Sequence, residues 1–293
     1  MKKYLIKRAL YLLALLLCVT FFTFAVTTSV PGGDITGGSS GDASYFFRYT
    51  AWLRVILLGQ TKGLNLPRNA AFIHFGQLMP GTIRFAGISF FFIVVISLPL
   101  GLLCAVKKDS ISDYIIRIFS FLGASIPNFI LGFLLMFYIA VRYRWFPVIG
   151  SAKPRSMVLP VIALTTPLIS RYIRHIRGVA LEELNREYIV GATARGVHQW
   201  RIILFHVIPN ALPSMLSFMR ISIGQLLSGV VVIETVYVLS GVGSLAVSSV
   251  RSYDYPVIQA YVLWMAVLYI ATSLVIETIT NMTDPLFRRK WIT

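Results

Sequence analysis

Long apolar runs constrain this chain more than any other feature, because they recur along almost its whole length. The hydrocarbon core of a bilayer is about 30 Å thick, so a helix needs about 20 apolar residues to cross it. Of the 293 residues, 57% are hydrophobic and only 13% are charged, whereas soluble domains average about 25% charged residues. We therefore expect an all-α, polytopic protein of the cell membrane with six transmembrane helices, at Tyr11–Val30, Ile88–Val106, Phe119–Val141, Met157–Ile173, Ile221–Leu239 and Val257–Ile279.

Two of these runs have unusual features. The fourth is short and contains Pro160 and Pro167, which bend a helix because proline cannot donate its backbone hydrogen bond. The first follows a basic N-terminus and could be a secretory signal. It is longer than the apolar region of such signals, about 7–15 residues, and has no clear A-x-A cleavage site. We interpret residues 1–30 as a retained N-terminal segment that carries the first transmembrane helix.

The distribution of positive charge predicts the orientation of the spans. The net charge is +16, and Lys and Arg are enriched in the cytoplasmic loops of membrane proteins. We expect both termini and a segment at about 174–210 in the cytoplasm, residues 31–87 outside, and a five-helix core at 88–293. The outer segment could form amphipathic turns on the membrane surface or a plain tether. Nucleic-acid binding is not indicated, because no basic stripe with interleaved aromatic residues lies outside the apolar runs.

Motifs for catalysis and for nucleotide binding are absent from the sequence. There is no G-x-x-x-x-G-K-[ST] phosphate loop, no G-x-S-x-G nucleophile elbow and no H-E-x-x-H metal motif. The pair Gly241 and Gly243 resembles the start of a dinucleotide fingerprint, but a third glycine is missing, and the end of a helix is the better interpretation. We therefore expect no catalytic site, no metal site and no cofactor on this chain.

Two carboxylates, Glu234 and Glu277, fall inside the apolar runs. A charge at the centre of a bilayer costs about 2.5–3.5 kcal/mol on insertion scales, so such residues normally face a cavity or a partner. Each could line a polar pathway or gate, or could lie near the end of its span and there reach headgroup water or pair locally. The two interpretations are balanced for Glu234, and the second is favoured for Glu277.

The segment between the fourth and fifth runs predicts a compact cytoplasmic element. Leu181, Leu184 and Tyr188 have the spacing of one helix face. Negative charge stabilises the first turn of a helix, and three glutamates, Glu182, Glu183 and Glu187, lie early in the segment.

The second half of this element predicts a turn back toward the membrane. Small residues at 191, 192 and 194 would allow the helix to lie close to another surface. Gly196 can adopt positive φ and end the helix, and Pro209 is typical of the first turn of the next one. We expect Gly191 and Ala192 to lie against a partner protein.

At these residues the chain resembles the permease subunits of ABC importers, whose motif reads E-A-A, three residues, Gly, nine residues and I-x-L-P. With Gly196 aligned, Val190 replaces the leading glutamate and His206 replaces the isoleucine. The segment is more similar to that of the dipeptide, oligopeptide and nickel branch, Y-V-x-x-A-x-A-K-G. The resemblance implies that an ATPase-coupling site is formed by Tyr188, Gly191, Ala192, Ala194, Arg195, Gly196 and Pro209.

The resemblance extends over nearly the whole chain. TAWLRVILLGQTKG is similar to an outer segment of these permeases, and GASIPNFILGFLL is similar to their third span. ETVYVLSGVG and the later DYP resemble the family's E-T-x-F-x-x-P-G-x-G and D-Y-P, with Ser240 in place of the proline. The candidates for a pathway or gate carried over from this segment are Glu234, Thr235, Gly241, Gly243 and Asp254.

The resemblance implies the type I ABC importer permease fold, as the B-type subunit of a pair. The expected partners are a second homologous permease subunit, two cytosolic ATPases that bind ATP and magnesium, an extracytoplasmic substrate-binding protein and membrane lipid. Peptides are the favoured substrate, with nickel or another metal chelate as the alternative. An ion-gradient-driven secondary transporter is the alternative function, although the sequence has no convincing internal repeat, and an intramembrane enzyme is less favoured.

Overall fold

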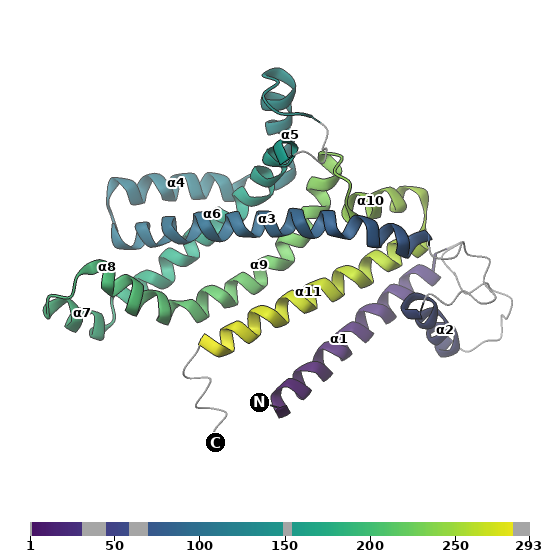
Figure 1. Ribbon diagram of the computed structural model, residues 1–293, viewed down its shortest axis with the longest axis horizontal. Helices are drawn as coiled ribbons and strands as arrows, with labels where there is room; N and C mark the ends of the chain where they lie inside the picture. The colour runs from purple at the N-terminus through teal and green to yellow at the C-terminus, as the bar shows by residue number, and fades with distance from the viewer. Residues whose placement is uncertain (1, 31–44, 59–69, 149–153, 284–293) are drawn as a thin grey trace. The chain divides into compact units, whose positions relative to one another are not determined.

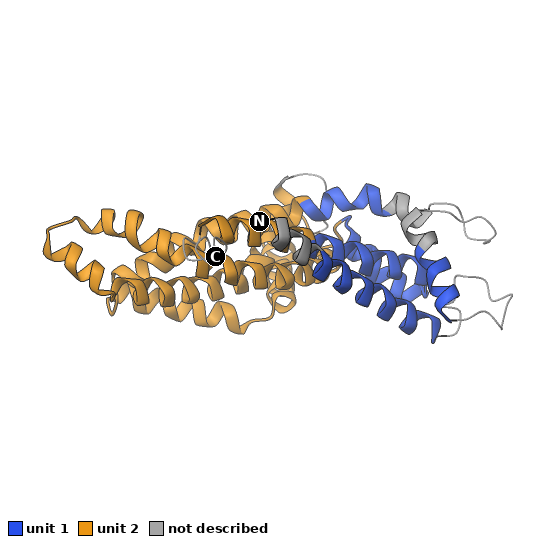
Figure 2. Cartoon of the chain, turned by 90° about the horizontal axis from the view of Figure 1, so that it is seen from below, with its two compact units in different colours: residues 1–83, 240–270 blue, residues 84–239, 271–293 orange. Residues whose placement is uncertain are grey.

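The computed structural model describes the backbone of residues 2–30, 45–58, 70–148 and 154–283, and every regular element in these ranges is helical (Figure 1). The chain forms two compact units (Figure 2). The first unit comprises residues 1–83 and 240–270, and the second comprises residues 84–239 and 271–293. The last ten residues, on which the predicted cytoplasmic C-terminus depends, lie outside the described part.

Five helical segments of the described chain are long and apolar enough to cross a membrane: Leu10–Thr28, Phe75–Val106, Arg155–Leu184, Gln199–Val236 and Tyr255–Thr283. The first, second and last lie in α1 (Lys2–Thr28), α3 (Ala70–Val106) and α11 (Tyr255–Thr283). The third contains α6 (Val158–Leu184), and the fourth combines α8 (Gln199–Ile202), a π-helix (Ile203–Val207) and α9 (Ile208–Val236). The multi-pass, all-helical architecture expected from the apolar runs is confirmed.

The predicted third span is not a single straight helix. It is split between α4 (Ile111–Ser125) and α5 (Asn128–Leu135), which continues as a π-helix to Arg142, and the two parts meet at an angle of 97°. The cause is Pro127, because steric clash disfavours the helical region for the residue before a proline. Ile126 accordingly has φ −90° and ψ 120°. The described chain has six spans only if this bent pair counts as one.

The second unit is built around α6, which packs against α4, α5 and α9. Its apolar core includes Leu164, Val230 and Ile233, all nearly inaccessible to solvent. Glycines stand where helices come closest: a Cβ atom at Gly101 would lie 2.7 Å from the side chain of Ile176 in α6. Small residues at such crossings are the usual means of close helix packing in membranes.

The first unit contains a helix within the outer segment, α2 (Tyr45–Leu58), packed against α1. A buried polar chain joins its elements: the Trp52 indole N–H donates to the Gln259 side-chain oxygen over 2.7 Å, and the Gln259 amide donates to the Thr27 hydroxyl over 2.6 Å. The described part of residues 31–87 is therefore a packed element and not a plain tether. Residues 31–44 and 59–69 of that segment are outside the described ranges, and α3 begins well before the predicted start of the second span at Ile88.

Candidate functional site

The predicted coupling segment begins with a break that the sequence did not reveal. α6 ends at Leu184 and α7 (Glu187–Ala194) starts after two non-helical residues, so Leu181, Leu184 and Tyr188 do not share one helix face as predicted. Likewise, Glu182 and Glu183 lie at the C-terminal end of α6, and only Glu187 occupies a first helical turn. Ion pairs hold the break, because the Arg186 guanidinium lies 3.2 Å from Glu183 and 3.4 Å from Glu182.

The phenol of Tyr188 ties α7 to two long helices. Its hydroxyl donates to a Glu183 carboxylate oxygen at the end of α6 over 2.6 Å, and it accepts from the Asn210 amide at the start of α9 over 2.9 Å. Burial, followed by the hydrogen bond to Glu183, raises the pKa of the Tyr188 hydroxyl above its ordinary value. The phenol therefore stays protonated and keeps donating at physiological pH.

The inner face of α7 is apolar and packs on its own chain. Ile189 and Ala192 belong to a buried cluster with Ala105 of α3, Ala180 of α6, Ile202 and Val207. Ala192 is only 1% exposed. The prediction that Ala192 lies against a partner protein is therefore wrong for its side chain, which instead fixes α7 on the second unit. A small residue is needed there because packed interiors tolerate added volume poorly.

The outer face of α7 is open to solvent. Val190 is 61% exposed, and Gly191, Ala194 and Arg195 are exposed beside it, as expected for residues spaced along one side of a helix. A Cβ atom added at Gly191 would meet nothing within 4 Å. We define these four residues, Val190, Gly191, Ala194 and Arg195, as the outer face of α7.

The turn after α7 has the predicted glycine geometry. Gly196 has φ +80°, a backbone conformation that residues with a Cβ adopt at a cost of about 1–2 kcal/mol. Pro209 lies in the first turn of α9 as predicted, although α9 is continuous with the preceding π-helix and α8. The π-helix directly precedes this proline, which has no N–H to donate to the regular pattern of helical hydrogen bonds.

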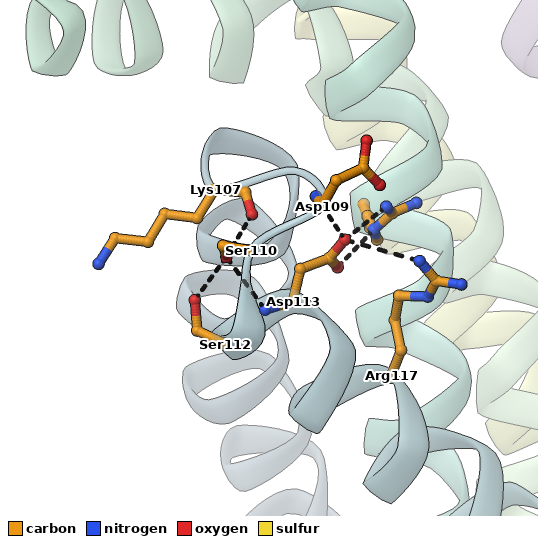
Figure 3. Close-up of polar contacts among 7 residues, drawn as sticks. Lys107, Asp109, Ser110, Ser112, Asp113 and Arg117 are labelled. Atoms are coloured by element: carbon orange, nitrogen blue, oxygen red, sulfur yellow. Dashed lines mark hydrogen bonds and ion pairs between the residues drawn. The ribbon is translucent and has the colours of Figure 1, made fainter.

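A buried ion pair that was not predicted from the sequence helps to hold α6, the helix that precedes α7 (Figure 3). Asp113, in the first turn of α4, is inaccessible to solvent and receives two hydrogen bonds of 2.8 Å from the Arg177 guanidinium of α6. Arg117 lies 3.7 Å from the same carboxylate, and the Asp109 backbone N–H donates to it over 3.2 Å. The pair joins the α3–α4 turn to α6.

One local signal for Asp113 is present in the sequence. Ser110 precedes α4 and its hydroxyl accepts from the Asp113 backbone N–H over 3.4 Å, which is the arrangement of a helix N-cap. The spacing S-x-x-D resembles a capping box, so it predicts a helix start at this point. It does not reveal that Arg177, far along the chain, supplies the counter-charge.

The pathway candidates Glu234 and Thr235 lie in the last turn of α9. Glu234 is 1% exposed, and its backbone carbonyl accepts from the Leu239 N–H over 2.9 Å, closing a Schellman-type turn. The left-handed position of that turn is Val238, with φ +50°. A β-branched residue in this conformation is strained, so the end of α9 is held by its surroundings and not by local preference.

The other candidates lie at helix starts. Gly241 precedes α10 (Val242–Ser252), so the interpretation of Gly241 and Gly243 as the end of a helix is wrong. The Val242 N–H donates to the Thr82 hydroxyl of α3 over 2.9 Å, which satisfies one of the free donors at this terminus. Asp254 precedes α11 and accepts from the Val257 N–H over 3.4 Å, as an N-cap does.

The second carboxylate in an apolar run has a local partner. Glu277 of α11 lies 3.5 Å from the Arg220 guanidinium of α9. Of the interpretation favoured from the sequence, headgroup water or local pairing near the end of the span, the ion pair confirms the pairing for Glu277.

Comparisons with known proteins agree with this geometry. Residues 97–289 match the family model described as "Binding-protein-dependent transport system inner membrane component". The metal-staphylopine import system permease protein CntB of Staphylococcus aureus is 32% identical over 73% of this chain and 68% of its own length. The oligopeptide transport system permease protein AppB of Bacillus subtilis is 28% identical over 97% of this chain and 99% of its own length.

The fold is shared with a solved transporter. An inward-facing structure of the MetNI methionine ABC transporter matches with a TM-score of 0.60 and 21% identity, over 72% of this chain and 96% of the matched chain. This likeness places the fold in the type I ABC importer permease class. The chain therefore belongs to the family of binding-protein-dependent transport system inner membrane components and is a multi-pass permease subunit of an ABC importer.

Proposed function

We propose that the chain forms half of a translocation pathway, together with a second homologous permease subunit. Two cytosolic ATPases would bind ATP and magnesium and hydrolyse the ATP, and an extracytoplasmic binding protein would deliver the substrate. The observation that supports this proposal is the packing of α7: its inner face is packed on the chain, while its outer face is exposed. A short helix held in this way is suited to a groove on an ATPase, and this role requires the cytoplasmic orientation expected from the charge distribution.

The contacts of α7 suggest how movement would be transmitted. A displacement of α7 by an ATPase would act on α6 through Tyr188 and Glu183, and on α9 through Tyr188 and Asn210. The apolar cluster beneath α7 adds contacts to α3 and α6. We infer that α7 moves with these long helices as one body, which is the requirement for a rigid-body switch between inward-open and outward-open states.

Peptides are the substrates that we propose. Of the two relatives compared, AppB belongs to an oligopeptide transport system and CntB to a metal-staphylopine import system, so a metal chelate is the second candidate. Uptake by the complex reconstituted with its ATPases and binding protein should be ATP-dependent and should select peptides from a panel of peptides and nickel chelates. Uptake of chelates alone would replace the peptide assignment, and uptake that needs no ATP would contradict the proposed function.

Glu234 is the residue that we propose for a gate. It is buried in the last turn of α9, directly before the strained turn at Val238. Glu234→Gln keeps the shape and removes the charge, so we expect unchanged amounts of protein in the membrane but altered uptake or ATP hydrolysis without transport. Thr280→Val in α11, outside the pathway candidates, is a control for a change of polarity at a half-buried position. Normal coupled uptake by Glu234→Gln would assign this carboxylate a purely structural role.

A further inference from the structure

A cavity of about 530 Å³ opens in the second unit beside the break between α4 and α5. Its lining comes from three places: the break itself, α6 near Pro167 and the middle of α9. The polar side chains that line it include Asn128, Arg171, Gln225 and Ser228. The cavity is therefore a half-polar space among helices that are otherwise apolar.

Three sequence features produce this space. Pro127 splits α4 from α5 and turns the chain by 97°, and Pro167 lies inside α6. Gly229 brings α9 close to the break, since a Cβ atom there would lie 2.8 Å from the Asn128 amide nitrogen. Irregular helices at membrane depth are tolerated mainly where they are covered by protein or line a polar cavity.

Arg171 gives the cavity its charge. Its guanidinium donates to the Gln225 side-chain oxygen over 2.8 Å. Four guanidiniums of the second unit lie within ion-pair distance of a carboxylate: Arg117, Arg177, Arg186 and Arg220. No such ion pair of Arg171 is found among the described residues. A guanidinium carries five N–H donors and no acceptor, so one amide oxygen leaves most of its donors available.

Arg171 is a half-buried charged residue within an apolar segment. It lies at the middle of α6, near the inner end of the predicted fourth span, within a segment apolar enough to span a membrane. Ionisable residues in such segments usually face a water-filled cavity and mark a solute pathway. Gln225 holds the guanidinium from α9, and Ser228 lies one turn along the same helix with its hydroxyl bonded to the Gln225 carbonyl over 3.0 Å.

We propose that this cavity is a pathway subsite that receives a carboxylate group of the transported solute. Arg171 supplies the charge and two parallel N–H donors that match a carboxylate, while the Asn128 amide and Ser228 add neutral hydrogen-bonding groups. The assignment rests on the proposed function and deepens it, because it names the chemistry that the pathway selects. A peptide C-terminus and a carboxylate-bearing metal chelator both present this group.

Charged thiol reagents test the anion preference without any transport. Ser228→Cys is placed in a Cys18→Ser background, since Cys18 is exposed and Cys104 is buried. In the assembled complex we compare sulfonatoethyl methanethiosulfonate, an anion, with trimethylammonioethyl methanethiosulfonate, a cation. The ratio of the two rates should favour the anion by about tenfold over the ratio at a reference cysteine, because charged clefts concentrate ions of opposite sign.

The reference cysteine is Ser217→Cys, which is exposed on the same helix and outside the cavity lining. It lies roughly 16 Å from Ser228 along α9, beyond the screening length of about 10 Å. Arg171→Gln should lower the ratio at Ser228→Cys to the reference value and leave Ser217→Cys unchanged, and Arg171→Lys should retain the preference. The proposal is overturned if Arg171→Gln leaves the ratio at Ser228→Cys unchanged. It is also overturned if Ser228→Cys shows no anion preference in the protein that retains Arg171. Modification of Ser217→Cys alone overturns it as well, because it would mean that the cavity is covered in the complex.

Uptake then distinguishes the two sources of carboxylate. If peptides are the solutes, Arg171→Gln should lower uptake of a dipeptide about tenfold, the effect of one lost charge-assisted hydrogen bond, and hardly change uptake of its C-terminal amide. If chelates are the solutes, the same loss should appear for nickel with a carboxylate chelator. Equal uptake of every solute by both proteins overturns the subsite. Uptake that needs no ATP contradicts the proposed function alone, because the reagent ratio does not depend on transport.

Discussion

Gly191→Trp should strongly weaken ATPase association and lower ATP-dependent uptake while leaving the permease folded and inserted. Gly191 lies on the outer face of α7, and a Cβ atom there meets no atom of the chain within 4 Å. The added ring would therefore project toward the partner and not into the permease. If an ATPase groove covers this face, the overpacking should cost about 1–3 kcal/mol. Co-purification of the ATPases, together with uptake, measures the effect.

Ala192→Trp, one residue away, should fail for a different reason. Its side chain is enclosed by the cluster beneath α7, so a large ring would displace α7 from the permease and lower the thermal stability of the isolated subunit. Gly196→Val should strain the turn at φ +80° without adding bulk to the outer face. Asn185→Trp adds the same ring at an exposed residue outside α7 and should do much less. Retention of both bound ATPase and uptake by Gly191→Trp would show that the outer face of α7 is not the coupling surface.

The apolar runs predicted most of the architecture because membrane insertion depends on composition over about 20 residues. The glycine turn at Gly196 was also predictable, since positive φ is a local property that few residue types accept. These features require no knowledge of which helices are neighbours. The same is true of Pro209, whose position in the first turn of α9 follows from its missing N–H.

The features that were missed depend on tertiary packing or on one residue within a long run. The bend at Pro127 interrupts an apolar stretch: the proline is a local signal for a break, but the 97° angle depends on how the two parts pack. The break at Asn185 and Arg186 is stabilised by ion pairs and by Tyr188, which bonds to both α6 and α9. Small residues predicted a close contact for α7, but only the packing shows that Ala192 makes it with its own chain. The cavity at Arg171 could likewise not be predicted from the sequence alone, because its lining forms only where α6 and α9 lie side by side.

Asp113→Ala should destabilise the permease more than the loss of any exposed ion pair. The Asp113 carboxylate is inaccessible, and the Arg177 side chain that it pairs with is 19% exposed. Removing one partner of a buried pair leaves an uncompensated charge and costs about 3–5 kcal/mol in soluble proteins. The matched control is Glu182→Ala, which removes a pair with Arg186 in which both side chains are at least half exposed. Such surface pairs contribute about 0–1 kcal/mol.

The effect should also reach the coupling segment, because the α3–α4 turn held by Asp113 follows Ala105, a member of the cluster beneath α7. Thermal unfolding of the detergent-purified subunit should show a much lower midpoint for Asp113→Ala than for Glu182→Ala. ATPase co-purification should fall with it. The double variant Asp113→Leu with Arg177→Met removes both charges and should recover much of the lost stability, since apolar replacements of buried pairs are often neutral. Equal midpoints for Asp113→Ala and Glu182→Ala would mean that the pair contributes little and that α6 and the α3–α4 turn are held together by apolar contacts alone.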